Sequence, residues 1–508
     1  VPKVAGKKGK KIKQQLLEIQ NEYPKIIESV KGKGLMLGIK FASNSKSLFP
    51  RILQQKKVFG YVLSSYLLKE HGLRILPSIS ASNTLRIEPS VKIGKRDIKK
   101  MSIGLADLCS LLKKKDYYSL TRHLMQNDPF SDSKGLMPSS GFISTEIELP
   151  AKNAVQVGFV AHFAYPTEEM RMLFKSFTKA SDTGLLRLFS KWATLIDMEP
   201  FVLNAKNLYN GKIHLTTVVL PLDSASMEKS HRTGSRKKIL CNIQIAVDLA
   251  ALTGSKYISL GGYNSILSGN GKMILEPEGT KVLTGNTLTS VIGYANFKRH
   301  LLSFLDKNTP LKIGIVGAMG NIGKILAKRL CKETDLNVAQ LLLVGKDLKR
   351  LKNQANQIVG LSANKTIEIV TSVNLQDLKN CNGILVAVNT NDAIINEHHI
   401  DIMKKTVISD LSVPTALSEG LNDFPNICIT PFSASVALEK DPDYLTTSCS
   451  PRGTALCCLA EAILNGFEEI PFQLRGDITM EGFEKVEKQA EKFGFFHKTD
   501  KIKSYKVY

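Results

Sequence analysis

Two neighbouring cysteines stand where a nucleophile could act. Cys457 and Cys458 lie near the beginning of an apolar helical stretch that follows Pro451. The partial positive charge at a helix N-terminus stabilises a thiolate and lowers its pKa, and the thiolate is the form that accepts an acyl group. The pattern therefore indicates a candidate catalytic cysteine. Free cysteines are also among the most buried residues of proteins, so the alternative is a thiol that only fills the core.

A glycine-rich loop is the second feature with a chemical use. A short apolar strand at 312–316 runs directly into the loop, and a helix follows at 324–330. Glycines at such a bend let the backbone approach a pyrophosphate, and the amides of the helix N-terminus point toward it. The pattern predicts a dinucleotide site made by Gly317, Met319, Gly320, Asn321, Ile322 and Gly323. A tight turn that binds nothing is the alternative.

The residues after the second strand bear on the choice of nicotinamide cofactor. Enzymes that use NAD usually place Asp or Glu at this point, where it binds the ribose hydroxyls. Here the first position after Gly345 is Lys346, and Arg350 follows one helical turn later. Both cations could meet a 2′-phosphate, so the sequence favours NADPH over NADH. Alternatively, they are the solvated start of a helix.

Alternating strands and helices must position these features. Apolar strands at 340–344, 367–370, 383–388, 406–410 and 427–430 follow the loop. They predict a Rossmann-like, doubly wound α/β domain with a parallel sheet, and upstream residues predict a separate α/β substrate domain. We divide the chain into an N-terminal α+β segment, a linker, the substrate domain, the NADP domain and helices carrying the cysteine, at 1–120, 121–154, 155–305, 306–452 and 453–508.

The charge of the chain is unevenly distributed. The formal net charge is +23, yet residues 1–120 alone carry 25 Lys and Arg against 8 Asp and Glu. Only 7% of the residues are aromatic, and basic motifs interleaved with aromatic side chains are missing, which argues against nucleic-acid binding. The eight cysteines lack the spacing of a metal site, and the run Glu397-His398-His399 lacks a further ligand at a useful spacing. No apolar run is long enough to predict a membrane span. We therefore expect a cytoplasmic protein with reduced thiols and no metal.

From about Val157 to Phe495 the chain resembles the cyanobacterial long-chain acyl-acyl carrier protein reductases. Ordered matches run along the whole region. They are Gly158-Phe159-Val160-Ala161-His162, Arg236-Lys237, Leu260-Gly261-Gly262-Tyr263-Asn264-Ser265-Ile266, Thr284-Gly285-Asn286-Thr287-Leu288-Thr289, the Gly317 loop and Cys458-Leu459-Ala460-Glu461-Ala462. The last two stretches outside the loop are the specific ones. The family's aromatic-rich stretch before the cysteine is not reproduced at 441–450, which bears on acyl chain length.

The resemblance implies a chemistry and a role for several residues. Cys458 matches the family's acylated cysteine, and Lys346 falls where the family has an arginine suited to the 2′-phosphate. The implied reaction is NADPH-dependent reduction of a fatty acyl thioester to the aldehyde through a thioacyl cysteine. The thioester would be carried by acyl carrier protein or coenzyme A.

Other matched residues receive less specific roles. Asn286, Thr287 or backbone amides are candidate oxyanion donors. His162 is either an acid or orienting group, or a hydrogen-bonded histidine near a strand end. The remaining candidates line or approach the substrate, and they are Gly261, Gly262, Thr284, Arg236 and Lys237. The two basic residues belong to a cluster that either meets an acidic carrier or a phosphopantetheine phosphate, or forms a solvated helix face.

Residues 1–120 resemble the C-terminal small domain of class III pyridoxal-phosphate aminotransferases. The resemblance rests on Lys31–Ile39 and on Asn83–Pro89, within which Arg86 matches a carboxylate-binding arginine. Helices are expected at 12–23, 58–70 and 95–114. The family's large domain, with its Schiff-base lysine, is missing, so pyridoxal phosphate is expected only if that domain is present. We therefore expect this chain to be either the reductase end of a longer reductase–aminotransferase or a decayed fusion of the two, and the first residue, Val1, agrees with a fragment.

Two other functions remain open at this point. Dehydrogenases of the shikimate and glutamyl-tRNA reductase type also join a substrate domain to a nucleotide domain with a glycine loop. The position of Cys458 after the nucleotide domain argues against the tRNA-linked type. A non-catalytic, basic nucleic-acid-binding or scaffold protein is the reading suggested by net charge alone. A homo-oligomer is compatible with each of them.

Overall fold

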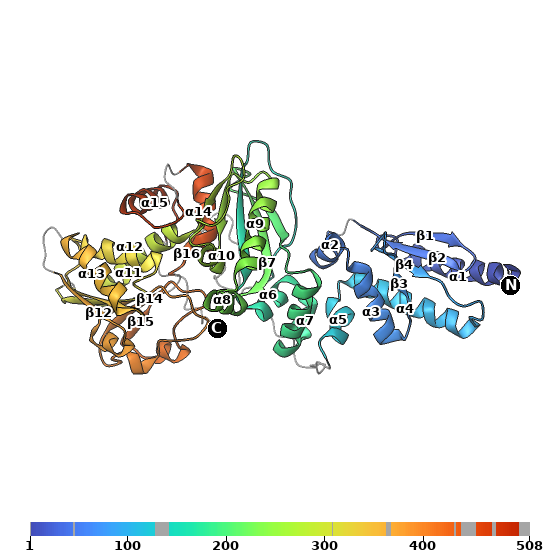
Figure 1. The fold of residues 1–508 in the computed structure, drawn as a ribbon, viewed down its shortest axis with the longest axis horizontal. Coiled ribbons are helices and arrows are strands. Elements are labelled where there is room, and N and C mark those ends of the chain that lie inside the picture. The colour runs from blue at the N-terminus through green and yellow to red at the C-terminus, as the bar shows by residue number, and fades with distance from the viewer. Residues whose placement is uncertain are drawn as a thin grey trace. The chain divides into compact units, whose positions relative to one another are not determined.

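The computed structural model describes residues 2–43, 46–126, 142–306, 308–361, 367–430, 433–437, 454–469 and 474–496 (Figure 1). They form two compact units. The first comprises 1–146 and 166–199, and the second comprises 147–165 and 200–508. The stretch 441–450 lies outside the described residues. Within the described part, no helix has the length and apolar character needed to cross a membrane.

The first unit is built on a four-stranded antiparallel sheet. Its strands run in the order β1 (Ile27–Lys33), β2 (Met36–Phe41), β4 (Thr84–Ile87) and β3 (Leu76–Pro77). Its first four helices along the chain are α1 (Pro2–Glu22), α2 (Leu48–Gln55), α3 (Phe59–His71) and α4 (Lys95–Lys114). Helix α1 begins earlier than the predicted Ile12, because lysine is a good helix former and fills its first turns. Ile12, Leu16 and Ile19 form its buried face.

Residues 166–199 pack with the first unit, although the sequence division places them in the substrate domain. They form α6 (Pro166–Leu173) and α7 (Asp182–Leu195). The ring of Phe174 meets the rings of Phe49 and Tyr117 edge-on, with centroids 5.7 and 5.8 Å away. Phe49 and Tyr117 stack on each other at 4.7 Å. Burying these large rings together explains why the segment leaves the domain that surrounds it in sequence.

The second unit contains a five-stranded sheet that holds the expected substrate residues. Its order is β6 (Phe201–Leu208), β7 (Ile213–Asp223), β5 (Val155–Phe163), β8 (Tyr257–Leu260) and β9 (Lys281–Leu283). Only β6 runs antiparallel to its neighbour. Three helices follow these strands, α8 (Ser224–Thr233), α9 (Lys237–Leu252) and α10 (Tyr263–Leu267). The carboxyl ends of β7, β5 and β8 therefore lie side by side.

A second sheet in this unit has six parallel strands. The order is β12 (Glu368–Ser372), β11 (Val338–Val344), β10 (Leu311–Val316), β13 (Gly383–Val386), β14 (Thr406–Asp410) and β15 (Ile427–Ile429). Helices α12 (Asn321–Cys331) and α13 (Leu348–Ile358) connect its first strands. The strand order reverses between β10 and β13, as in doubly wound dinucleotide-binding sheets. The predicted α/β class with a parallel, Rossmann-like sheet is confirmed.

The chain returns to the first of these sheets after completing the second. Helix α11 (Asn286–Phe304) links the two sheets, and α14 (Cys457–Phe467) packs against α11, β5 and β8. Helix α15 (Met480–Lys492) then lies along α11 (Figure 1). One continuous apolar core joins these helices to both sheets. Helix α14 thus covers the five-stranded sheet, although about 150 residues of the chain separate it from α11.

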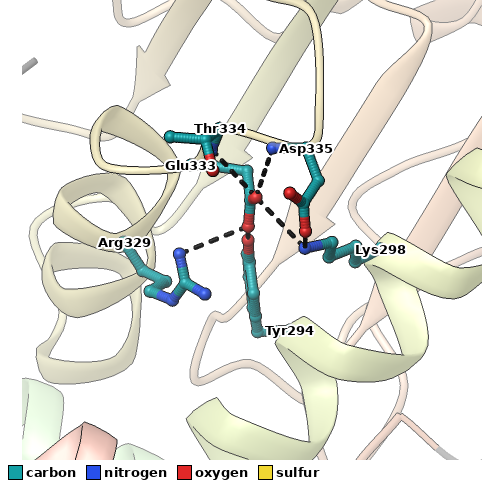
Figure 2. Close-up of polar contacts among 6 residues, drawn as sticks. All are labelled: Tyr294, Lys298, Arg329, Glu333, Thr334 and Asp335. Atoms are coloured by element: carbon teal, nitrogen blue, oxygen red, sulfur yellow. Dashed lines mark hydrogen bonds and ion pairs between the residues drawn. The ribbon is translucent and has the colours of Figure 1, made fainter. Parts of the chain in front are cut away.

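A buried carboxylate connects α11 to the end of α12, as Figure 2 shows. Glu333, whose side chain is 2% exposed, follows the end of α12. It accepts hydrogen bonds from the hydroxyl of Tyr294 and the amide of Asp335, and it pairs with Lys298 at 3.1 Å and Arg329 at 3.2 Å. Tyr294 and Lys298 belong to α11, and Arg329 belongs to α12. A buried charge needs such partners to offset its desolvation.

Replacing this carboxylate is expected to weaken the second unit. Glu333→Gln removes the charge and leaves Lys298 and Arg329 facing a neutral amide. We expect the free energy of unfolding to fall by about 3 kcal/mol, measured by urea denaturation. Glu484→Gln is the control, because Glu484 lies exposed on α15. Equal stability of the two variants would contradict the role assigned to Glu333.

Candidate functional site

The two cysteines at the start of α14 have different surroundings. Cys457 is fully buried, and its amide donates to the carbonyl of Ala434 at 2.9 Å. Cys458 stands on the first turn of the same helix and keeps partial exposure. Of this pair, Cys458 is therefore the less buried residue.

The electrostatics of Cys458 correct one expectation from the sequence. Burial raises the pKa of its thiol to about 12, and the charge of Glu461 raises it further. The amides of Leu459 and Gly262 act in the opposite direction by donating hydrogen bonds. The helix N-terminus therefore does lower the thiol pKa, but desolvation outweighs it. In this state of the protein Cys458 is a protonated thiol, not the thiolate that the helix position alone predicts.

One turn presses against Cys458 from α11. Gly285 precedes this helix with φ +71°, and a Cβ atom there would lie 2.1 Å from the Cα of Cys458. Glycine is therefore required by both conformation and space. The carboxylate of Glu461 binds this turn, accepting from the amide of Gly285 at 2.7 Å and from that of Leu288 at 2.9 Å. Glu461 is fully buried, and burial raises its pKa to about 7 although these amides oppose the shift.

A second turn, Gly261–Tyr263, approaches Cys458 from the end of β8. His162 holds it, because Nε2 of His162 accepts the amide hydrogen of Tyr263 at 3.1 Å. Burial lowers the pKa of His162 to about 4, so the ring is neutral. An Nε2 that accepts this hydrogen bond carries no proton to give to a substrate. Of the two roles left open by the sequence, the geometry supports a histidine that orients a turn and through it the Gly262 amide.

The predicted oxyanion donors Asn286 and Thr287 stand on the first turn of α11, and the side chain of Asn286 is hydrogen-bonded. Nδ2 of Asn286 faces Oγ of Ser265 at 3.3 Å and Oδ1 of Asn270 at 3.5 Å. Thr287 is buried, and the hydroxyl of Thr284 donates to the carbonyl of Leu474 at 3.2 Å. Thr284 and Thr287 line a small hollow with residues 474–479. Among the described residues, the amide of Gly262 is a donor that reaches the sulfur of Cys458 from outside α14.

The glycine loop has the backbone geometry that a pyrophosphate needs. Gly317 adopts φ +84°, and a Cβ atom there would meet the carbonyl oxygen of Ala387 at 2.1 Å. Gly320 is the N-cap of α12, and Gly323 packs on the carbonyl of Gly317. Met319 lies beside Gly345. The loop thus presents backbone without side chains at the point where the strand order reverses, and α12 begins there with its N-terminus. We call this loop the glycine cradle.

The side chain of Asn321 contacts the segment before α15. Its Nδ2 donates to the carbonyl of Gly476 at 2.6 Å, and its Oδ1 accepts from the amide of Ile478 at 2.9 Å. The side chain therefore clamps the segment before α15 and is not free to bind a cofactor. Ile322 packs against the apolar core.

The cations after β11 are placed next to this cradle by strand pairing, because β10 and β11 are parallel neighbours. Lys346 and Arg350 are exposed. The intervening Asp347 caps α13 by accepting the amide hydrogen of Arg350 at 3.0 Å. The carboxylate of Asp347 is thus used in capping the helix, and the side chains of Lys346 and Arg350 stay exposed beside it.

The other predicted binding residues, Arg236, Lys237 and Arg86, lie on elements other than the cysteine helix. Arg236 is the N-cap of α9, and Lys237 is exposed on its first turn. Their neighbour Arg232 is ion-paired with Glu228, which reduces the basic cluster. Arg86 lies in the first unit on β4, 3.9 Å from Glu88. In the described part of the chain, no three His, Cys, Asp or Glu side chains gather in a way that could hold a metal ion.

Sequence reasoning overlooked Glu461 as a functional residue. It was visible as part of the Cys458–Ala462 match, and its spacing of three from Cys458 places both on one side of a helix. Nothing in the sequence signalled its partners, since Gly285 lies 176 residues away.

Comparison with known proteins yields matches among solved structures only. No protein-family model matches the sequence, and no curated protein is similar to it. L-Tryptophan dehydrogenase from Nostoc punctiforme is 13% identical, with 74% of this chain and 90% of that chain covered and a TM-score of 0.29. Quinate dehydrogenase from Corynebacterium glutamicum in complex with NAD is 13% identical, with coverages of 55% and 88% and a TM-score of 0.28.

An S-selective transaminase from Arthrobacter sp. with alanine bound is also similar. It is 19% identical, with 22% of this chain and 26% of that chain covered and a TM-score of 0.19. The chain thus spans about a quarter of the length of the transaminases it matches.

Proposed function

We propose that the second unit reduces a fatty acyl thioester to an aldehyde with NADPH. One observation carries the proposal: an accessible cysteine at a helix N-terminus receives the Gly262 amide in the same unit that holds the glycine cradle. The match of Cys458 and its helix to the acyl-acyl carrier protein reductases supports the same reaction. The thioester is carried by acyl carrier protein or coenzyme A. Transamination is not proposed for a chain that spans about a quarter of its transaminase matches.

The residues divide the reaction into an acylation and a release. The thiol of Cys458 gives up its proton, its sulfur forms a bond to the acyl carbon, and the carbon–sulfur bond to the carrier breaks. The proton leaves with the carrier thiol. The amide of Gly262, fixed by His162, donates to negative charge that develops beside the sulfur. NADPH, when bound, would supply the hydride for the acyl carbon; the bond from that carbon to the sulfur of Cys458 would then break, giving the aldehyde and the Cys458 thiolate.

The backbone cradle and the two cations fit the phosphates of NADPH. Gly317, Gly320 and the first amides of α12 would hold the pyrophosphate, and Lys346 with Arg350 would hold the 2′-phosphate.

Removing a cation is expected to change the cofactor preference. In Lys346→Ala we expect KM for NADPH to rise about tenfold, because a charge-assisted contact to phosphate is lost, while KM for NADH stays within twofold. The control is Lys352→Ala, since Lys352 is exposed further along α13. A parallel rise of both KM values, or none, would show that Lys346 does not read the 2′-phosphate.

The activity itself is tested by mixing the protein with an acyl carrier protein thioester and NADPH and following the loss of nicotinamide absorbance and the appearance of aldehyde. A covalent acyl group on the peptide containing Cys458 is the expected intermediate, detected by mass spectrometry without NADPH. Oxidation of a polyhydroxy acid that is unaffected by Cys458→Ala would instead favour a shikimate-type dehydrogenase.

A further inference from the structure

We propose that Glu461 is a positioning residue that fixes the first turn of α11 against Cys458. The expected change in turnover rests on the proposed function. The effect of Glu461 on the Cys458 thiol can be measured without any substrate. Glu461 does not touch a reacting atom in this arrangement, so its effect passes through the turn it holds.

The hydrogen bonds of the carboxylate make the case. Each oxygen takes a separate amide, one at Gly285 and one at Leu288, so the group spans the whole first turn of α11. Amide donors at a helix N-terminus are unsatisfied unless a side chain or ligand binds them. Here a side chain from a different helix supplies both acceptors. Because Glu461 and Cys458 share α14, fixing the turn to Glu461 also fixes it to Cys458.

The tolerance of this arrangement is small. A Cβ atom at Gly285 would already overlap the Cα of Cys458, so the two backbones are in direct contact. The carbonyl of Gly285 is held in turn by the hydroxyl of Thr289 at 2.7 Å. A shift of the turn by a fraction of an ångström must therefore move the cysteine or open the contact.

Charge gives a second and independent link. The carboxylate raises the pKa of Cys458, whereas the amides of Leu459 and Gly262 lower it. The other titratable neighbour on this helix is Cys457, and His162 acts from β5 through the Gly262 turn. Neutralising Glu461 should therefore make Cys458 easier to ionise while the turn becomes less well held. Neutralising Glu461 should thus increase the reactivity of the thiol and decrease turnover. A general loss of structure in a folded variant does not predict this combination.

The test uses two substitutions of the full chain. Glu461→Gln keeps the size of the side chain but loses its charge. Its NH2 group would face one of the two backbone amides and could not accept that hydrogen bond. Glu461→Asp keeps the charge but is one methylene too short to reach both amides. The peptide containing Cys458 is followed by mass spectrometry during iodoacetamide alkylation at a series of pH values, and kcat is measured with acyl thioester and NADPH.

We expect the alkylation profile of Glu461→Gln to move to lower pH by about half a unit or more and kcat to fall at least tenfold. In Glu461→Asp the profile should stay near that of the wild type while kcat also falls. Glu333→Gln is the matched control, because it neutralises another buried carboxylate bound to α11, at Tyr294 and Lys298, without moving the Cys458 profile.

The outcomes separate this inference from the proposed function. An unmoved alkylation profile in Glu461→Gln overturns the positioning role, whatever the turnover. A shift equal to that in Glu333→Gln also overturns it, because the effect would then come from general loosening of α11. If the alkylation profile shifts in Glu461→Gln alone, while the wild-type protein reduces no acyl thioester, the proposed reaction is refuted but the positioning role of Glu461 stands.

Discussion

Cys458→Ala is expected to abolish thioester reduction, with a loss of turnover of at least about a thousandfold. Cys457, the neighbouring thiol, is buried in the core and should not replace Cys458 as the group that bonds to the acyl carbon. The substitution removes only the sulfur of a partly exposed side chain, so the fold should persist. The measurement is NADPH consumption with acyl carrier protein thioester, together with the mass of the acylated peptide.

The matched control is Cys457→Ala, which lies next to it on the same helix. It removes a buried sulfur and should reduce stability by roughly 1 kcal/mol, while acylation at Cys458 continues. Because the pKa of Cys458 is raised to about 12, the thiolate fraction should rise about tenfold per pH unit between pH 7 and 10. Acylation should follow it. Equal activity of the two alanine variants would exclude Cys458 as the nucleophile.

Gly285→Ala is expected to have the second-largest effect. The new methyl would stand 2.1 Å from the Cα of Cys458, in a backbone conformation of φ +71° that favours glycine. The turn and α14 must separate, which displaces the sulfur from the Gly262 amide. A misplacement of this size costs about a hundredfold in turnover.

The comparison with Gly279→Ala isolates the contact from the backbone strain. Gly279 has the same φ of +71°, but a Cβ atom there meets nothing within 4 Å. Both variants should lose roughly 1 kcal/mol of stability from the left-handed conformation, measured by urea denaturation, and only Gly285→Ala should lose turnover as well. Similar turnover in the two variants would show that the contact with Cys458 is unimportant.

Local patterns were sufficient for the parallel sheet and for the cradle. The strand before Gly317 and the helix after Gly320 are consecutive in the chain, so their geometry follows from short-range rules. The helix that carries Cys458 was also visible, because its apolar run is continuous. Its expected low thiol pKa was wrong, since desolvation depends on what covers the cysteine and the sequence does not show that.

The contacts that could not be predicted join distant segments. Glu461 meets Gly285, and Asn321 meets Gly476, across 176 and 155 residues. Similarly, Phe174 joins Phe49 because aromatic burial, not proximity in sequence, decides where α6 and α7 pack. The periodicity of a helix states that it has an apolar face, but not which other face will cover it.

The return of α14 to the first sheet has a consequence for synthesis. At about 5–20 residues per second, the ribosome needs roughly 15–60 s between making β5 and making the helix that covers it. During that time Val157 and Leu215, which pack in the same core as Ala460 and Ile463, have no such cover. During synthesis, this face of the five-stranded sheet therefore lacks its covering helix. Cys458 joins it only after the six-stranded sheet has been translated.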